Sequence, residues 1–546
     1  MKQLLYIALL LFSGHSVLAA SYTCHTEAGE LQSHIPTSGE SVTQLTVTGT
    51  LDARDFAYMG DSLTNLNLID LEGCTIAAYE SRDTYLGNQA RFEAHTLPAH
   101  TFLGFQKLTM VKLPKGTQVI GEAAFAGCPA LTTIVWGEQL RSIGDLAFSG
   151  CPALDTPLPA TLRSIGEYSF AGCTAYTELN LESAPLKSIG ANAFAGCTRL
   201  AAIALPASLQ TIGDRCFAGC SALTAIALPA ALQSLGEGCF AYCTSLSQVD
   251  MKRILLTSIP AYAFDHCTSL TSLHTPAMTE EIGEGAFYYC TSLSQVDMKR
   301  ILLTSIPAYA FDHCTSLTSL HTPAMTEEIG EGAFYYCTSL LDCTLPTRLR
   351  EIADYAFAGC SRMEHLSFLP EGLERIGRWP FYGMRQLYSA TIPSTVTYIG
   401  DHAFDSCTRL AAVMAYPTEP PALGEEVFLN VQQADCALGA PDESIELYRN
   451  APQWQEFDIR HFSNREEIAD DHTLQVYFEH EILRVKASDP MRQIALYTLD
   501  GRIVHREEGD THEWDIDTHS YTGPIFVLSI QMQSGEYRHL KVGRNR

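Results

Sequence analysis

Residues 200–220 read LAAIALPASLQTIGDRCFAGC, and close variants of this phrase recur along most of the chain. Each copy ends in a phenylalanine followed three residues later by a cysteine, as in Phe217 and Cys220. A fixed period of this length is typical of a solenoid, in which one coil is too small to bury its own apolar side chains and stacks on the next. The phenylalanines recur every 22 to 24 residues, at positions 102, 125, 148, 170, 194, 217, 240, 264, 287, 311, 334, 357, 381, 404 and 428.

The apolar pattern within one repeat predicts short strands. Ile203 and Leu205 are two residues apart, which favours a strand with one buried face, and Pro206 ends it because proline cannot donate to a β-ladder. A second apolar segment ends at Ile212, and Gly213 suits a turn that needs unusual backbone angles. We therefore predict a mainly β protein with a solenoid of about 14 coils of 22–24 residues.

The repeated phenylalanines and cysteines form the predicted structural core. Eighteen cysteines in one chain first suggest disulfides, and Cys216 could pair with Cys239, or Cys337 with Cys343. The regular spacing favours reduced thiols packed as small apolar groups, since a ladder of equivalent cysteines specifies neither unique pairs nor a four-ligand metal cluster. No metal or cofactor is predicted. The clearest core pairs are Phe125 and Cys128, Phe148 and Cys151, Phe170 and Cys173, Phe194 and Cys197, and Phe217 and Cys220.

One passage of the repeat is duplicated. Residues 242–293 recur unchanged as residues 289–340, which a modular array accepts without disturbing its core. The copies carry distinctive charged side chains, and duplication would double a contact patch through multivalency. The candidate ligand-binding residues are Asp250, Lys252 and Arg253, copied as Asp297, Lys299 and Arg300.

Composition and the first residues limit the possible partners. The 546 residues are too many for one compact core, and the net charge of -27 argues against nucleic acid or an anionic membrane surface as a partner. Residues 1–20 combine Lys2, an apolar run and small residues, which is the layout of a secretory signal peptide. The mature chain is thus expected to be exported, with no integral membrane span after removal of the signal.

The last residues read differently from the repeat. Residues 463–473 are an expected acidic linker. From residue 474 onward apolar and polar residues alternate, with Asp-Gly at 500–501 and Ser-Gly at 534–535 placed as hairpin turns. Residues 474–546 are therefore predicted to form a small β-sandwich.

Motifs for catalysis do not stand out. The triplet Asp265-His266-Cys267 and its copy at 312–314 could suggest a metal site or a nucleophile, but the two histidines are two coils apart and a solvated loop is the expected structure. We find neither a Gly-x-Ser-x-Gly elbow nor a phosphate-binding Gly-Lys-Ser/Thr loop. The chain is predicted not to be an enzyme. A polysaccharide-active β-solenoid enzyme and a structural surface spacer without a specific ligand are the alternatives.

The repeat closely resembles the leucine-rich repeat of BspA-like surface proteins of Bacteroides-type bacteria. Residues 200–220 and LTTIVWGEQLRSIGDLAFSGC (131–151) carry the resemblance, although Met384 and Phe105 stand where the pattern has cysteine. Segment 43–76 is similar to the N-terminal cap of such proteins, and LYRNAPQWQEF (447–457) is similar to the segment that closes the last coil. The resemblance implies a cap over 21–95, a solenoid with its closing cap over 96–462, and a cell-surface or secreted adhesin that binds host extracellular or bacterial surface proteins.

The C-terminal segment is similar to the sorting domain of the type IX secretion system. ALYTLDGRIV (495–504), YTGPIFVLSI (521–530) and RHLKV (538–542) follow the order of that domain, although Pro524-Ile525-Phe526 departs from its usual Gly-x-Tyr. The resemblance implies export across the inner and outer membranes, with the outer-membrane secretion machinery as a partner. The residues that carry the motif are Gly501, Arg502, Gly523 and Lys541.

Overall fold

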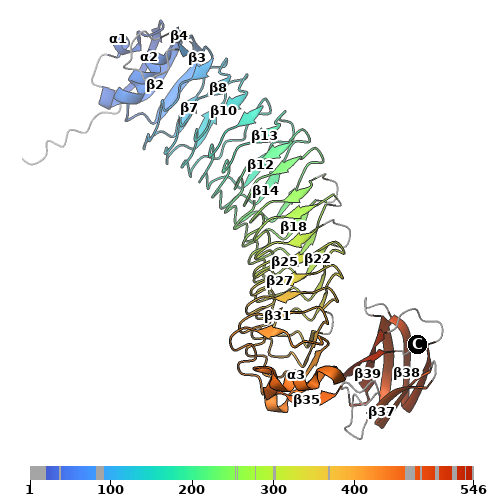
Figure 1. Cartoon of the computed structure of the whole chain (residues 1–546). Helices are drawn as coiled ribbons and strands as arrows, with labels where there is room; N and C mark the ends of the chain where they lie inside the picture. Colours follow the sequence, from blue (N-terminus) through green and yellow to red (C-terminus); the bar gives the residue numbers. More distant parts are fainter. Residues whose placement is uncertain are drawn as a thin grey trace, which may run out of the picture. The chain divides into compact units, whose positions relative to one another are not determined.

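The computed structural model has two compact units, residues 1–296 and 297–546 (Figure 1). The predicted signal peptide, apart from Ala20, and the predicted linker 463–473 lie outside the described residues. The predicted fold is confirmed, since the chain is mainly β and consists largely of stacked parallel coils. The structure describes residues 20–35, 39–80, 91–251, 254, 256–276, 278–298, 303–366, 369–461, 474–479, 482–498, 503–518, 525–534 and 537–543.

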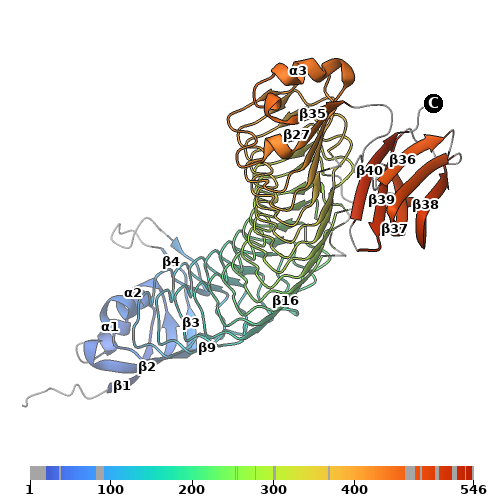
Figure 2. The same cartoon turned by 90° about the horizontal axis from the view of Figure 1, so that it is seen from below.

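The first unit begins with strands that are longer than those of the repeat. Three of them, β1, β2 and β3, pair in parallel and continue into the solenoid strands β7 and β9. Figure 2 shows α1 and α2 at the same end of the unit as these strands. The Asp55 carboxylate accepts hydrogen bonds from the backbone N–H groups of Gly29 (2.7 Å), Leu31 (3.0 Å) and Asp52 (2.9 Å). These bonds hold the start of α2 against the turn that leads into α1. The elements are β1 (Ala20–Thr26), α1 (Leu31–His34), a 3-10 turn (Gly39–Ser41), β2 (Val42–Leu51), α2 (Ala53–Ser62), β3 (Leu68–Ile76), β4 (Tyr79–Glu80) and β5 (Arg91–Phe92).

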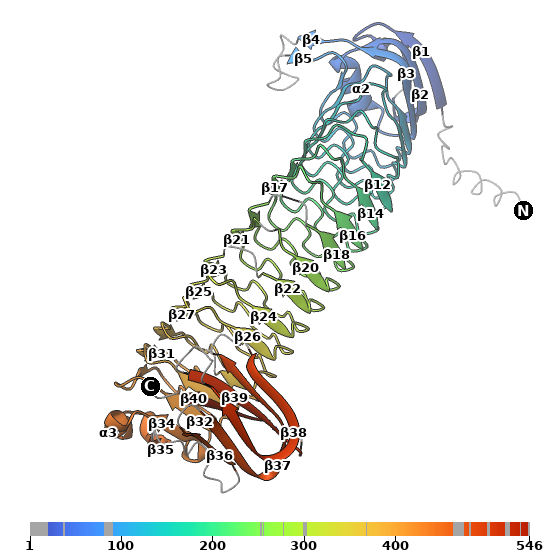
Figure 3. The same cartoon turned by 90° about the vertical axis from the view of Figure 1, so that its right-hand side faces the viewer.

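Each typical coil of this unit contributes a three-residue strand and a two-residue strand. The registers are regular: Ile203 lies opposite Leu179, and Ile212 lies opposite Ile189. Figure 3 shows β12, β14, β16 and β18 following one another along one side of the unit. The strands are β6 (Thr96–Leu97), β7 (Met110–Lys112), β8 (Val119–Ile120), β9 (Thr133–Val135), β10 (Ser142–Ile143), β11 (Ser164–Ile165), β12 (Glu178–Asn180), β13 (Ser188–Ile189), β14 (Ala202–Ala204), β15 (Thr211–Ile212), β16 (Ala225–Ala227), β17 (Ser234–Leu235), β18 (Gln248–Asp250), β19 (Ser258–Ile259), β20 (Ser272–His274), β21 (Glu281–Ile282) and β22 (Gln295–Asp297).

The expected reason for Gly213 is wrong. Its backbone does not adopt a positive φ; within its coil the left-handed residues are Arg215 (φ 51°) and Gly219 (φ 73°). A β-carbon on Gly213 would instead lie 2.5 Å from the backbone nitrogen of Ala191 in the preceding coil. Glycine at this position therefore lets successive coils approach closely, which a sequence pattern cannot distinguish from a turn requirement.

The second unit continues the same pattern, and its solenoid part ends in a helical cap. Its two-residue strands β23, β25, β27, β29, β31 and β33 form one parallel sheet. The strands are β23 (Ser305–Ile306), β24 (Ser319–His321), β25 (Glu328–Ile329), β26 (Asp342–Thr344), β27 (Glu351–Ile352), β28 (His365–Leu366), β29 (Arg375–Ile376), β30 (Ser389–Ile392), β31 (Tyr398–Ile399), β32 (Ala412–Ala415), β33 (Ala422–Leu423), β34 (Ala437–Ala440) and β35 (Asp458–His461). The cap adds α3 (Ile445–Asn450) and 3-10 turns at Gln433–Asp435, Asp442–Ser444 and Trp454–Glu456.

The C-terminal residues form an antiparallel sheet that is compatible with the expected sandwich. Strand β37 is long enough to pair with β36 through its first half and with β39 through its second half, while β38 runs along both halves. Leu483, Val485, Ile494 and Leu528 are fully buried in its core. The strands are β36 (Leu474–Glu479), β37 (Ile482–Thr498), β38 (Ile503–Asp517), β39 (Ile525–Met532) and β40 (Tyr537–Gly543).

A column of stacked phenylalanine rings forms the core of the solenoid. In the first unit, neighbouring ring centroids along this column are 5.1 to 5.7 Å apart. All ten phenylalanine and cysteine side chains named above as the structural core are fully buried. Such stacking gives every coil the same apolar contact with its neighbours, which explains the strict spacing of the repeat.

All 18 cysteines are reduced thiols in the structure, including Cys216, Cys239, Cys337 and Cys343. The thiols of the repeat donate hydrogen bonds to the preceding coil; Cys197, for example, donates to the backbone oxygen of Phe170 at 3.3 Å. Burial raises the pKa of Cys197 to about 12, which keeps this thiol protonated and able to donate. These cysteines thus link adjacent coils through hydrogen bonds and packing.

Candidate functional site

The structure does not test the predicted charged patch. Asp250 is the exposed last residue of β18, and Asp297 is the last residue of β22. Lys252, Arg253, Lys299 and Arg300 lie outside the described residues, so their role stays a prediction.

The same holds for the residues of the predicted sorting motif. Gly501, Arg502 and Gly523 lie outside the described residues. The backbone of Lys541 belongs to β40 and lies opposite Val527 of β39.

A different set of side chains gathers at the turn between the phenylalanine and the cysteine. The residue just before the cysteine has a left-handed backbone in every typical coil, and in the early coils it is glycine, as in Gly196 (φ 70°) and Gly219 (φ 73°). Later coils place a ring there, which costs about 1–2 kcal/mol per residue because a β-carbon crowds the backbone. We call these residues the aromatic ladder: Tyr242, His266 and Tyr289 in the first unit, and His313 and Tyr336 in the second.

The rings of the ladder stack on one another at the surface. In the first unit the centroid of His266 lies 4.6 Å from that of Tyr242 and 4.8 Å from that of Tyr289, with near-parallel planes. In the second unit His313 and Tyr336 stack at 5.2 Å. Tyr242 remains 52% exposed and Tyr336 38% exposed, so the ladder presents aromatic surface to solvent.

Each ladder histidine is held by the carboxylate that precedes it. Nδ1 of His266 lies 2.5 Å from Oδ1 of Asp265, and His313 makes the equivalent contact with Asp312. The expected solvated loop is therefore wrong for the two carboxylates, because Asp265 and Asp312 are buried. Burial raises the pKa of both carboxyl groups, that of Asp312 to about 6. Within the described part of the chain, no group of three or more His, Cys, Asp and Glu could hold a metal ion.

The Asp312 carboxyl makes the stability of the second unit depend on pH. Burial raises its folded-state pKa from 3.8 to about 6, although His313 acts in the opposite direction. The folded protein therefore binds this proton more tightly than the unfolded chain, and the resulting stability is complete below pH 3.8 and lost as the pH rises through about 6. We expect the Tm of the wild type, relative to Asp312→Asn, to rise when the pH falls from about 7 to about 4. A constant Tm difference in thermal unfolding across this range would contradict the assignment.

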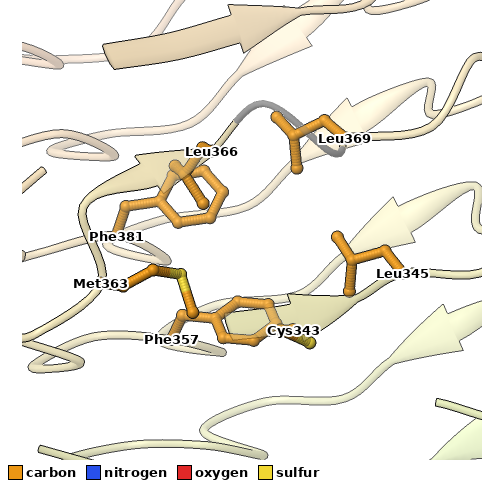
Figure 4. A pocket seen from close by; sticks show the side chains of 7 residues that line it. All are labelled: Cys343, Leu345, Phe357, Met363, Leu366, Leu369 and Phe381. Carbon is orange, nitrogen blue, oxygen red and sulfur yellow. The ribbon is translucent and has the colours of Figure 1, made fainter. Parts of the chain in front are cut away.

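A small apolar pocket lies within the second unit (Figure 4). Its volume of about 20 Å³ is close to that of one water-sized probe, which is too small for an organic ligand. It is a packing gap in the core, not a binding site. Its lining residues are Cys343, Leu345, Phe357, Met363, Leu366, Leu369 and Phe381.

Stacked parallel coils with a regular apolar core define a leucine-rich repeat protein, a class that typically serves as a non-enzymatic binding scaffold. The sequence model of the BspA type leucine rich repeat region matches residues 95–188, 181–294 and 280–411, in six copies. These segments cover more than half of the chain, which therefore belongs to this family of bacterial cell-surface proteins.

Solved structures of bacterial proteins are similar to this chain. A leucine-rich repeat protein from Bacteroides ovatus ATCC 8483 is 27% identical, with a TM-score of 0.55, over 70% of this chain and 90% of that one. A leucine rich cell surface protein from Faecalibacterium prausnitzii A2-165 is 25% identical, with a TM-score of 0.40, over 64% of this chain and 87% of that one. A leucine-rich repeat protein from Eubacterium ventriosum ATCC 27560 is 19% identical, with a TM-score of 0.41, over 62% and 88% of the two chains. No curated protein matches the sequence.

In the described part of the chain, every helix is too short or too polar to cross a membrane.

Proposed function

We propose that the protein is a secreted or cell-surface adhesin-like protein that binds host or bacterial proteins through the aromatic ladder, and that it has no catalytic activity. The observation that carries the proposal is the exposure of ladder rings at backbone positions where other coils of the same chain have glycine. Tyrosine is enriched at protein interfaces, where it supplies a large rigid contact area.

The energetics of the ladder position support a binding role. A tyrosine there bears the left-handed strain of about 1–2 kcal/mol, whereas stacking between exposed rings returns only about 0.5–1.5 kcal/mol per pair. The fold therefore gains little from these rings, and the early coils form without them. The duplication of residues 242–293 copies the Asp-His pair and its neighbouring tyrosine, so one chain carries two similar patches and can bind with avidity.

The test replaces the ladder of the first unit by the residue that other coils use. Tyr242→Gly, His266→Gly and Tyr289→Gly, combined in one full-length variant, relieve backbone strain and remove three rings. We expect the free energy of unfolding to change by no more than about 1–2 kcal/mol per site, because lost stacking and relieved strain nearly cancel. Attachment to immobilised host matrix and bacterial surface proteins, measured by biolayer interferometry, should weaken at least about tenfold.

Tyr168→Gly provides the matched control. Tyr168 is 43% exposed and left-handed (φ 53°), but it lies at another position of the turn and outside the ladder. The control should bind as the wild type does. Unchanged attachment of the triple variant would refute the first-unit ladder as a binding surface, and binding that never saturates would indicate a structural spacer.

The route to the surface is part of the proposal. We infer that residues 1–20 direct export, and that residues 474–546 are a sorting domain read by the outer-membrane secretion machinery. Its motif residues are Gly501, Arg502, Gly523 and Lys541. The support is the resemblance of segments 495–504, 521–530 and 538–542 to that domain, together with an independent apolar core in this sheet.

A further inference from the structure

The second unit has an open groove that crosses several coils. Its volume is about 470 Å³, within the range of small-molecule sites. It lies just beyond the ladder ring of Tyr336, and we call it the arginine groove. Its lining includes Tyr336, Arg362, Tyr382, Gly383, Arg385 and Gln386.

The groove exists because the ladder position returns to glycine. After Tyr336, the next two coils place Gly359 (φ 77°) and Gly383 (φ 69°) there. A β-carbon on Gly359 would lie 3.1 Å from the Tyr336 ring, whereas a β-carbon on Gly383 would meet nothing within 4 Å. Open space therefore follows the last ring of the ladder, at the level where a further ring would stack.

The charge of the groove is opposite to that of the chain. Arg362 and Arg385 are exposed, and among the described residues neither has a carboxylate at ion-pair distance. Several other arginines of this unit are paired with a carboxylate: Arg350 lies 2.7 Å from Glu374, for instance. None of the residues lining the groove is Asp or Glu, although the chain has 62 acidic against 35 basic residues. Two unpaired guanidinium groups favour an anionic ligand, and a carboxylate fits their planar fork.

The backbone of the groove argues against a peptide that binds through its main chain. The N–H groups of Tyr336, Gly359 and Gly383 already donate to carbonyl oxygens of the following coil, at 2.8, 2.7 and 2.9 Å. What remains for a ligand is a set of side chains: tyrosine rings, hydroxyl groups such as that of Ser361, the NH2 group of Gln386 and the two arginines. The Oε1 atom of Gln386 already accepts a hydrogen bond from Arg409. Rings that stack on a flat apolar face, beside many short polar groups, suit a sugar.

We propose that the arginine groove binds a carboxylated sugar, with the carboxylate on Arg362 and Arg385, the sugar ring against the Tyr336 side chain, and its hydroxyl groups on the Gln386 NH2 group and Ser361. This site goes beyond the proposed protein binding by the ladder. It lies in the other unit from the three ladder residues replaced above, so each proposal can fail without the other.

The test uses isothermal titration of the full chain with two acidic probes, 3′-sialyllactose and a hyaluronan tetrasaccharide, and with lactose as the neutral counterpart. We expect at least one acidic probe to bind, and lactose to bind at least about tenfold more weakly, because a bidentate arginine–carboxylate contact is lost. Arg385→Gln should weaken the acidic probe by about tenfold or more.

A variant that fills the groove separates binding from folding. Gly383→His adds a side chain at a position where the chain itself carries histidine in two other coils, and it should abolish binding of the acidic probe while leaving the Tm within a few degrees. Gly104→His is the matched control, because a β-carbon on left-handed Gly104 (φ 73°) also meets nothing within 4 Å; it should bind the probe normally. Equal affinity for 3′-sialyllactose and lactose, no binding of either acidic probe, unchanged binding by Gly383→His, or binding of a tetraglutamate peptide in preference to the sugars would each overturn the proposal.

Discussion

Phe217→Ala is expected to lower the free energy of unfolding of the first unit by about 3–5 kcal/mol. The Phe217 ring is fully buried between Phe194 and Phe240, with centroids 5.7 Å away on both sides and nearly parallel planes. Backbone hydrogen bonds between coils keep them from closing over the missing ring. The Phe217 N–H donates to the backbone oxygen of Cys239 at 2.9 Å, and the Gly219 N–H donates to the backbone oxygen of Ala241 at 2.7 Å. A cavity that cannot collapse gives a cost towards the upper end of this range.

Urea unfolding followed by far-UV circular dichroism measures this effect. Phe217→Leu keeps most of the apolar volume and should cost clearly less than the alanine variant. Tyr168→Ala, which removes an exposed ring, serves as the surface control and should cost less than about 1 kcal/mol. A loss no larger than that of Tyr168→Ala would contradict the idea that the phenylalanine column holds the coils together.

The sequence predicted the parts of the fold that repeat. Phe217 and Cys220 recur at a fixed spacing. A fixed spacing of this length indicates a repeat architecture, so the stacked coils could be predicted from the sequence. The role of Gly213 did not follow, because close approach between coils and a left-handed turn both require glycine, and only coordinates distinguish them. The burial of Asp265 did not follow from the sequence either, because a charged residue in a turn is ordinarily expected at the surface.

The candidate sites were harder to predict. The ladder was visible in principle, as the change from FAGC at 194–197 to FDHC at 264–267, which replaces a glycine by a ring at a turn position. The pattern itself does not tell that this position is left-handed or that its neighbours stack. No sequence motif marks the arginine groove. Arg362 and Arg385 belong to different coils, and they line the same groove only because those coils stack on one another.

Trp454→Ala is expected to destabilise the cap that closes the solenoid in the second unit. The side chain is 1% exposed, and its indole N–H donates to the backbone oxygen of Pro421 at 3.1 Å. Its ring packs against Phe428 (centroids 5.5 Å apart) and Tyr448 (5.4 Å). Phe428 stacks on Phe404 at 5.4 Å, so the tryptophan covers the outer end of the phenylalanine column in this unit.

Loss of the tryptophan removes about 3–5 kcal/mol of buried contacts and leaves Phe457 as the remaining ring of the cap that packs on Phe428. Because stability in a solenoid is a sum of local and nearest-neighbour terms, the damage should decline with distance from the cap. Hydrogen exchange read by mass spectrometry should therefore show strongly increased exchange in residues 398–431, a smaller increase near Phe357, and almost none in the first unit. Trp379→Ala removes a half-buried tryptophan from the same unit without touching the cap, and its effect should centre on its own coil. Uniform destabilisation of both units by Trp454→Ala would show instead that the coils unfold as one cooperative block, and that the cap acts on the whole array.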